Sequence, residues 1–377
     1  MDQKNLIYSE DAISTLALSF ISGIGNILVK QLVAYAGSPS EVFKSSKRLL
    51  EKIPGIGPNL IQNLEKEKEA CLEWANIELE SLEKRGGVMF TYLEKTFPSR
   101  LKAIPDCPPV LFARGTFNFE NPRVLAIVGT RQATPYGKQA IESFLEELVQ
   151  FNPVIVSGLA YGIDIHAHKI SLKVGLETWG IMATGVDDVY PSAHKTTASQ
   201  MEQMGGVLTE NLLHTKPDAP RFPARNRIIA GLADAIWVVE AMEKGGAQIT
   251  ARLGADYFKD VFALPGNINQ KASVGCNNLI QRNAATVVTS GLQLAESMGW
   301  KLGDQHSSIV KTKVRPQDLG ELDHQILDLL LKTGDIILDE IAWRTQIPVN
   351  QLASQLLMLE FIGLVKSLPG KKFGLSK

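Results

Sequence analysis

Small and polar residues follow several apolar runs in the middle of the chain. A Gly-Thr-Arg triplet comes directly after the run 124–128, and Ser-Gly comes directly after the run 154–156. Such residues leave backbone N–H groups open to a ligand, and a nearby guanidinium favours an anion such as phosphate. A third segment, 222–227, adds two further guanidinium groups. The candidate site residues are Gly129, Thr130, Arg131, Ser157, Gly158, Arg225, Asn226 and Arg227.

For any single glycine in this set, the turn that every strand-to-helix connection needs is the simpler interpretation. The set as a whole favours a ligand, because Arg131 places a permanent cation where a phosphate would bind. Asp164, His166 and His168 do not suggest a metal, because neighbours two apart on a helix diverge. Asp164 is better explained as a first-turn helix acid.

The elements that must position these residues form an alternating pattern between about 105 and 300. Short runs rich in Val and Ile alternate with amphipathic helical stretches, which indicates a parallel sheet buried on both faces. The predicted strands are 124–128, 154–156, 178–183, 207–209, 236–239, 261–264 and 286–289. In such a doubly wound sheet, ligands bind at the carboxyl ends of the strands, where the candidate residues lie.

The regions on either side of this core are predicted to be separate domains. Residues 1–100 contain Gly-Ile-Gly at 23–25 and again at 55–57, each before an apolar helical pattern, which is typical of helix-hairpin-helix or SAM-like domains. A linker is predicted over 301–317. Residues 318–377 read as three short helices and a hairpin turning at Pro369-Gly370, the winged-helix pattern.

Composition narrows the class of protein. The chain has 377 residues, 45% hydrophobic and 21% charged, with a formal net charge of −1. A nucleic-acid site must therefore be a local basic patch rather than a globally basic surface. The three cysteines form no CxxC pair, which fits a reducing compartment. We expect a cytoplasmic protein without a bilayer span, a metal site or a cofactor.

Enzyme motifs are missing at the places where a nucleotide enzyme would need them. Gly137-Lys138 lacks the remaining residues of a P-loop, and no GxGxxG follows the first strand. There is also no GxSxG elbow. No catalytic residue is predicted.

The ordered motifs of the core resemble the DNA-processing protein A (Smf) family. They are the segments 157–164 with 167–168, 188–191, 222–232, 249–251, 264–266 and 275–280. The resemblance implies a Rossmann-like core that binds single-stranded DNA and dimerises. It also implies that Arg131 grips a phosphate and that Lys195 is a second cation. The family's GSLIT appears here as Gly246-Ala247-Gln248-Ile249-Thr250, which departs from the pattern.

The function implied by this resemblance is that of a recombination mediator. Such a protein protects incoming single-stranded DNA and loads the RecA recombinase during natural transformation. One alternative is a phosphoribohydrolase of the lonely-guy type, for which Glu240 is the only stand-in for a catalytic glutamate. Another is a winged-helix transcription regulator. Against it, residues 318–377 carry eight acidic and six basic residues, and the helix at 349–359 has no positive charge.

Overall fold

The computed structural model describes residues 8–302, 320–334, 336–361, 364–368 and 372–375. The chain divides into two compact units, Met1–Gln305 and His306–Lys377. The predicted linker lies outside the described residues from residue 303 onward, as does the predicted turn at Pro369-Gly370. Within the described residues, no helix is both long enough and apolar enough to cross a membrane.

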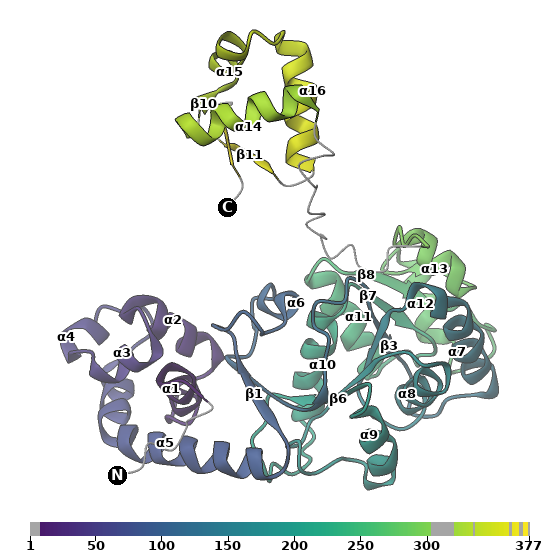
Figure 1. Ribbon diagram of the computed structural model, residues 1–377. Helices are drawn as coiled ribbons and strands as arrows, with labels where there is room; N and C mark the ends of the chain where they lie inside the picture. Colours follow the sequence, from purple (N-terminus) through teal and green to yellow (C-terminus); the bar gives the residue numbers. More distant parts are fainter. Residues whose placement is uncertain (1–7, 303–319, 335, 362–363, 369–371, 376–377) are drawn as a thin grey trace. The chain divides into compact units, whose positions relative to one another are not determined.

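The first unit begins with a helical subdomain (Figure 1). Its helices are α1 (Glu10–Leu18), α2 (Asn26–Ala36), α3 (Pro39–Lys44), α4 (Lys47–Leu50) and α5 (Pro58–Lys84). The two Gly-Ile-Gly hairpins pack against each other reciprocally. A Cβ on Gly23 would lie 2.7 Å from the side chain of Leu60, and one on Gly55 would lie 3.6 Å from that of Leu28. The repeat in the sequence therefore corresponds to a pair of interlocked hairpins.

Nine of the described strands form one sheet, in the order β1-β2-β6-β5-β4-β3-β7-β8-β9. Their bounds are β1 (Val88–Thr91), β2 (Val110–Thr116), β3 (Val124–Val128), β4 (Val154–Ser157), β5 (Thr178–Ile181), β6 (Gly205–Thr209), β7 (Ala235–Val238), β8 (Asp260–Ala263) and β9 (Thr286–Val287). β3 to β9 pair in parallel, whereas β2 is antiparallel to both β6 and β1. The chain runs outward from β3 through β4, β5 and β6, then returns to the other side of β3 with β7.

Helices cover both faces of the sheet. They are α6 (Ser99–Lys102), α7 (Pro135–Leu148), α8 (Ile163–Val174), α9 (Lys195–Met201), α10 (Arg221–Leu232), α11 (Gly246–Asp256), α12 (Val274–Gln281) and α13 (Gly291–Ser297), with short 3-10 turns η1 (Val149–Phe151) and η2 (Ser192–His194). Alternate residues of β3 belong to different cores. Leu125 and Ile127 pack with α7 and α8, whereas Val124 and Ala126 pack with α10 and α11.

The second unit has its own small core. It comprises α14 (Glu321–Thr333), β10 (Ile336–Ile337), α15 (Leu338–Thr345), α16 (Val349–Phe361), β11 (Val365–Leu368) and β12 (Lys372–Leu375). The strands are antiparallel in the order β10-β12-β11. Ile326, Ile341, Leu352 and Leu356 are buried together at its centre.

The predicted fold class is confirmed: a Rossmann-like core with an N-terminal helical domain and a C-terminal winged helix. Two features differ from the sequence prediction. β1 lies in a region predicted to be helical and extends the core sheet through β2, so the sheet is mixed rather than wholly parallel. β10 precedes α15 as a two-residue strand and is too short to leave a period-2 pattern.

The packing of α7 on the sheet includes a buried aromatic pair, whose contribution to stability can be measured by substitution. Phe144 of α7 stacks on Trp237 of β7 with ring centroids 4.0 Å apart. We expect Phe144→Ala to lower the free energy of unfolding by about 3–5 kcal/mol, because it leaves a cavity. Phe258→Ala is the matched control, because Phe258 is 97% exposed. It should change stability by no more than about 0.5 kcal/mol. Urea denaturation followed by circular dichroism measures both, and equal losses would contradict this packing.

Candidate nucleic-acid interface

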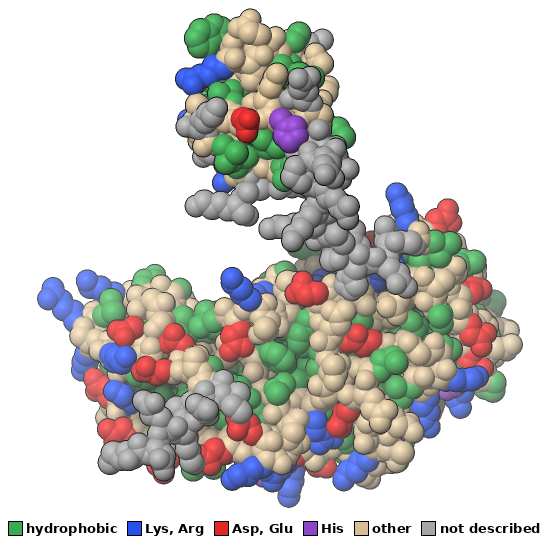
Figure 2. Space-filling view, in the orientation of Figure 1, with side chains coloured by type: hydrophobic (Ala, Val, Ile, Leu, Met, Phe, Trp, Pro, Cys, Tyr) green, Lys and Arg blue, Asp and Glu red, His purple; other side chains and the backbone are tan. Residues whose placement is uncertain are grey.

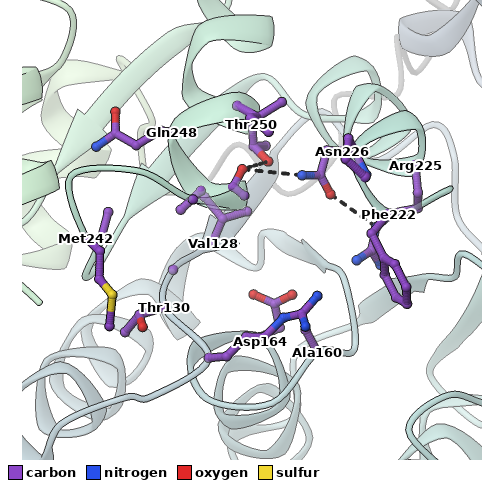
Figure 3. A pocket seen from close by; sticks show the side chains of 18 of the residues that line it. Val128, Thr130, Ala160, Asp164, Phe222, Arg225, Asn226, Met242, Gln248 and Thr250 are labelled. Carbon is purple, nitrogen blue, oxygen red and sulfur yellow. Dashed lines mark hydrogen bonds between the residues drawn. The ribbon is translucent and has the colours of Figure 1, made fainter. Parts of the chain in front are cut away.

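A cavity of about 1080 Å³ opens at the carboxyl ends of the strands, where the strand order reverses between β3 and β7. Its walls are the loop after β3, the loop after β7 and the first turns of α10 (Figure 3). This is the position at which open parallel sheets bind their ligands. The candidate residues that line it are Gly129, Thr130, Arg131, Arg225 and Asn226.

The loop after β3 presents a cation to this cavity. The Thr130 N–H donates to the carbonyl oxygen of Glu240 at 2.7 Å, which fixes the loop beside the end of β7. Arg131 is exposed, and its guanidinium carbon lies 5.4 Å from the centroid of the Phe222 ring. Among the described residues, no carboxylate forms an ion pair with Arg131. Its hydrogen-bond donors are therefore available to an anionic ligand.

The loop after β4 contacts the loop that carries Arg131. The Ile163 N–H donates to the Thr130 carbonyl oxygen at 3.1 Å. Gly162 has φ of +82°, and a Cβ there would lie 2.2 Å from the same carbonyl oxygen. Ser157 is buried and donates through its hydroxyl to the Ile127 carbonyl oxygen. Ser157 thus joins two strands and does not line the cavity.

Arg225 lies inside the protein, with 6% of its surface exposed. Its guanidinium donates to the carbonyl oxygens of Gly158 and Ile181. Burial lowers the pKa of Arg225 to about 10, and the charge of Asp164 opposes this shift. Burial likewise raises the pKa of Asp164, while Arg225 and the N–H groups of Ala160 and Gly158 oppose the rise. The two groups form a buried, mutually compensating pair of charges.

The remaining predicted residues occupy different surroundings. Asn226 bridges Arg225 Nε and the Gly246 carbonyl oxygen at 3.2 and 3.3 Å. Arg227 lies away from the cavity and pairs with Glu210 and with the carbonyl oxygen of Asp106. Lys195 is exposed at the first residue of α9, outside the cavity lining. The structure therefore brings Arg131 to the cavity as an exposed cation, whereas Arg225 and Arg227 are engaged with protein groups.

The cavity is also lined by residues outside the predicted set of site residues. Lys244 and Gln248 come from the loop after β7 and the start of α11, and Tyr190 comes from the loop after β5. The Tyr190 and Phe222 rings lie 5.8 Å apart. Strand-end position is the signal that could have identified Lys244, because its loop follows β7 as the Arg131 loop follows β3.

Glu240, the stand-in for a catalytic glutamate, is occupied by the protein. Its carboxylate accepts hydrogen bonds from the Thr134 N–H at 2.9 Å and from the Thr134 hydroxyl at 2.5 Å. The same hydroxyl accepts from the Gly137 N–H at the start of α7. Glu240 is buried, and it holds the first turn of α7 against the end of β7.

His168 is a buried histidine whose tautomer follows from its neighbours. The Thr178 hydroxyl donates to the Ile155 carbonyl oxygen, so it accepts from His168 Nδ1 at 2.7 Å. Burial lowers the pKa of His168 to about 3, with further contributions from Arg225 and His194. The ring is therefore neutral at physiological pH and serves the packing of α8 against β5.

Comparison with known proteins identifies the family. Residues 88–299 match the family described as DNA recombination-mediator protein A, and residues 311–371 match the DprA winged helix domain. The chain belongs to the DNA recombination-mediator protein A family. The protein Smf of Synechocystis is 31% identical over 392 residues, which cover 95% of this chain and 97% of that protein. The DNA processing protein DprA of Bacillus subtilis is 40% identical over 194 residues, 51% of this chain and 65% of that one.

Two solved structures of this family resemble the fold. DNA processing protein A from Streptococcus pneumoniae gives a TM-score of 0.64 at 30% identity, covering 77% of this chain and 98% of that chain. DNA processing protein A from Helicobacter pylori, solved for its single-stranded DNA binding mode, gives a TM-score of 0.51 at 29% identity. The match covers 56% of this chain and 95% of that chain. The recombination-mediator core thus contains the cavity described above.

The contact between Gly162 and the Arg131 loop can be tested with two glycines of similar φ. In Gly162→Ala, the new methyl group would clash with the Thr130 carbonyl. In Gly175→Ala, at φ of +77°, it would meet nothing within 4 Å. Both variants lose stability because φ is positive, but Gly175 lies in the left-handed helical region (ψ of 25°) whereas Gly162 lies outside it (ψ of −121°). We therefore expect Gly162→Ala to lose about 1–3 kcal/mol more, from its backbone conformation and the clash together. Urea denaturation measures this difference, and equal losses would mean that the two loops are not in close contact.

Proposed function

We propose that this protein binds single-stranded DNA at the cavity between β3 and β7. The observation that carries the proposal is Arg131, an exposed guanidinium without an ion-pair partner among the described residues, on a loop at the cavity whose backbone is hydrogen-bonded to Glu240 and Ile163. Its planar fork suits a phosphate oxygen pair. Lys195 supplies a second cation from the start of α9. Such contacts provide affinity with little dependence on base sequence.

Preference for single strands over duplex is supported by the aromatic side chains in the cavity. Tyr190 is 46% exposed, and Phe222 lies beneath the Arg131 guanidinium. Aromatic rings bind single strands by stacking on unpaired bases, and such stacking does not depend strongly on which base is present. The Helicobacter pylori relative was solved for its single-stranded DNA binding mode.

The proposal describes a binding protein rather than an enzyme. Glu240 is the only stand-in for the catalytic glutamate of a phosphoribohydrolase, and both of its carboxylate oxygens accept hydrogen bonds from Thr134. A carboxylate whose two oxygens already accept hydrogen bonds from the N-cap residue of a helix is a poor participant in proton transfer. This arrangement favours DNA binding over the phosphoribohydrolase alternative.

We further propose that the bound strand is protected and passed to the RecA recombinase, as the family resemblance implies for natural transformation. The protein would act as a homodimer formed through its Rossmann-like core. Ile268, which follows β8 and is 83% exposed, is an apolar side chain that such an interface could cover. A cytoplasmic location is part of the proposal, because all three cysteines are unpaired and buried.

The role of Arg131 is tested by substitution with a matched control. We expect Arg131→Ala to weaken oligothymidine binding roughly ten- to a hundredfold, because the lost charge-assisted hydrogen bonds are worth about 1.5–3 kcal/mol. The slope of log affinity against log salt should fall by about 0.7 for the lost phosphate contact. Fluorescence anisotropy at three salt concentrations measures both quantities.

Arg252→Ala is the control, because Arg252 is exposed on α11 and does not line the cavity. It removes the same charge and should change affinity less than threefold, roughly the effect expected of distant screened charges. Equal losses in the two variants, or wild-type binding by Arg131→Ala, would place the DNA elsewhere.

A further inference from the structure

The buried charges beneath the cavity join four elements of the core. Arg225 reaches from α10 to the carbonyl oxygens of Gly158, after β4, and Ile181, at the end of β5. Asp164, in the first turn of α8, supplies the opposite charge. Gly158 is required at this point, because a Cβ there would lie 2.6–2.7 Å from the guanidinium atoms of Arg225.

The buried pair Asp164 and Arg225 is connected to the loop that carries Arg131 by a few backbone contacts. Asp164 follows Ile163, whose N–H donates to the Thr130 carbonyl oxygen at 3.1 Å. Gly162 packs directly against the backbone of Thr130 and Arg131. The position of the Arg131 backbone is therefore set by the loop 157–164, and the conformation of that loop is set by Arg225 and Asp164.

We propose that Asp164 and Arg225 are positioning residues for Arg131 and do not themselves contact DNA. This inference rests on the proposed function, since it concerns how the phosphate-binding cation is held. Neither charge is stable without the other, because an uncompensated charge in the interior costs several kcal/mol. Their mutual dependence keeps the loop in one conformation, so the ordering of Arg131 is complete before a strand binds.

Asp164→Asn distinguishes positioning from simple electrostatics by the sign of its effect. The substitution keeps the shape of the side chain and removes a negative charge beside the anion site. Electrostatics alone would strengthen DNA binding. Positioning predicts weaker oligothymidine binding by about tenfold, within the range seen for residues that act through a neighbour.

Asp218→Asn is the matched control. Asp218 also lines the cavity but is exposed and outside the buried network. Loss of its charge should strengthen binding. Opposite signs for the two substitutions support the proposal, and stronger binding by both would overturn it.

A double-mutant cycle with Arg131→Ala separates this proposal from the function on which it rests. If Asp164 acts through Arg131, Asp164→Asn no longer weakens binding once Arg131 is alanine. An additive cycle would overturn the positioning role and leave the DNA site intact. Wild-type affinity in Arg131→Ala alone would instead overturn the proposed function.

A second variant, Arg225→Lys, provides an independent test if Asp164→Asn does not fold. Circular dichroism shows whether each variant is folded. Arg225→Lys keeps the buried positive charge but loses the planar fork that spans two carbonyl oxygens. Like Asp164→Asn, it should weaken oligothymidine binding in the wild-type background. In the Arg131→Ala background it should not weaken binding further. If both variants fail to fold, the pair serves overall stability and the positioning proposal is wrong.

Discussion

The site depends on the reversal of strand order between β3 and β7. The helix that follows β3, α7, packs on one face of the sheet, and the helix that follows β7, α11, packs on the other. The two connections must therefore separate as they leave the sheet, and a crevice remains between them. The exposed side chain of Arg131 lies at this crevice, on the loop that leaves β3.

Positive and negative charges are mixed on the surface of this protein. Acidic and basic side chains are interspersed over the face seen in Figure 2, in keeping with a net charge of −1. Several arginines have acidic partners: Arg100 pairs with Asp234, Arg227 pairs with Glu210, and the charge of the buried Asp164 acts on Arg225. Arg131 has no ion-pair partner among the described residues, and it lies at the cavity between β3 and β7.

Much of the core could be predicted from the sequence because parallel strands buried on both faces leave continuous runs of Val and Ile. The run 124–128 coincides with β3, and the glycines and cation that follow it lie at the cavity. β1 and β2 could not be found in this way. The segment between them contains α6 and buried apolar side chains such as Phe97 and Leu101, and the antiparallel pairing of β2 with β6 is a long-range event without a local pattern.

The arginine segment shows the limit of motif reading most clearly. Only Asn226 separates Arg225 from Arg227 in the motif, but residues two apart on a helix point in different directions. One therefore enters the interior and the other meets Glu210. The sequence indicates that guanidinium groups are needed in α10, but only packing decides whether they face a ligand or hold the backbone that does.

Competition between single-stranded and duplex DNA for the full-length protein, with a fluorescent oligothymidine as the bound probe, tests the proposed site most directly. Anisotropy would be followed at constant salt with unlabelled competitors of equal length. A cavity that holds phosphates and unpaired bases predicts that the single strand displaces the probe at a concentration at least tenfold lower than duplex, a ratio equivalent to about 1.4 kcal/mol. Equal displacement by the two forms would contradict the account, because it would mean that backbone charge alone is recognised.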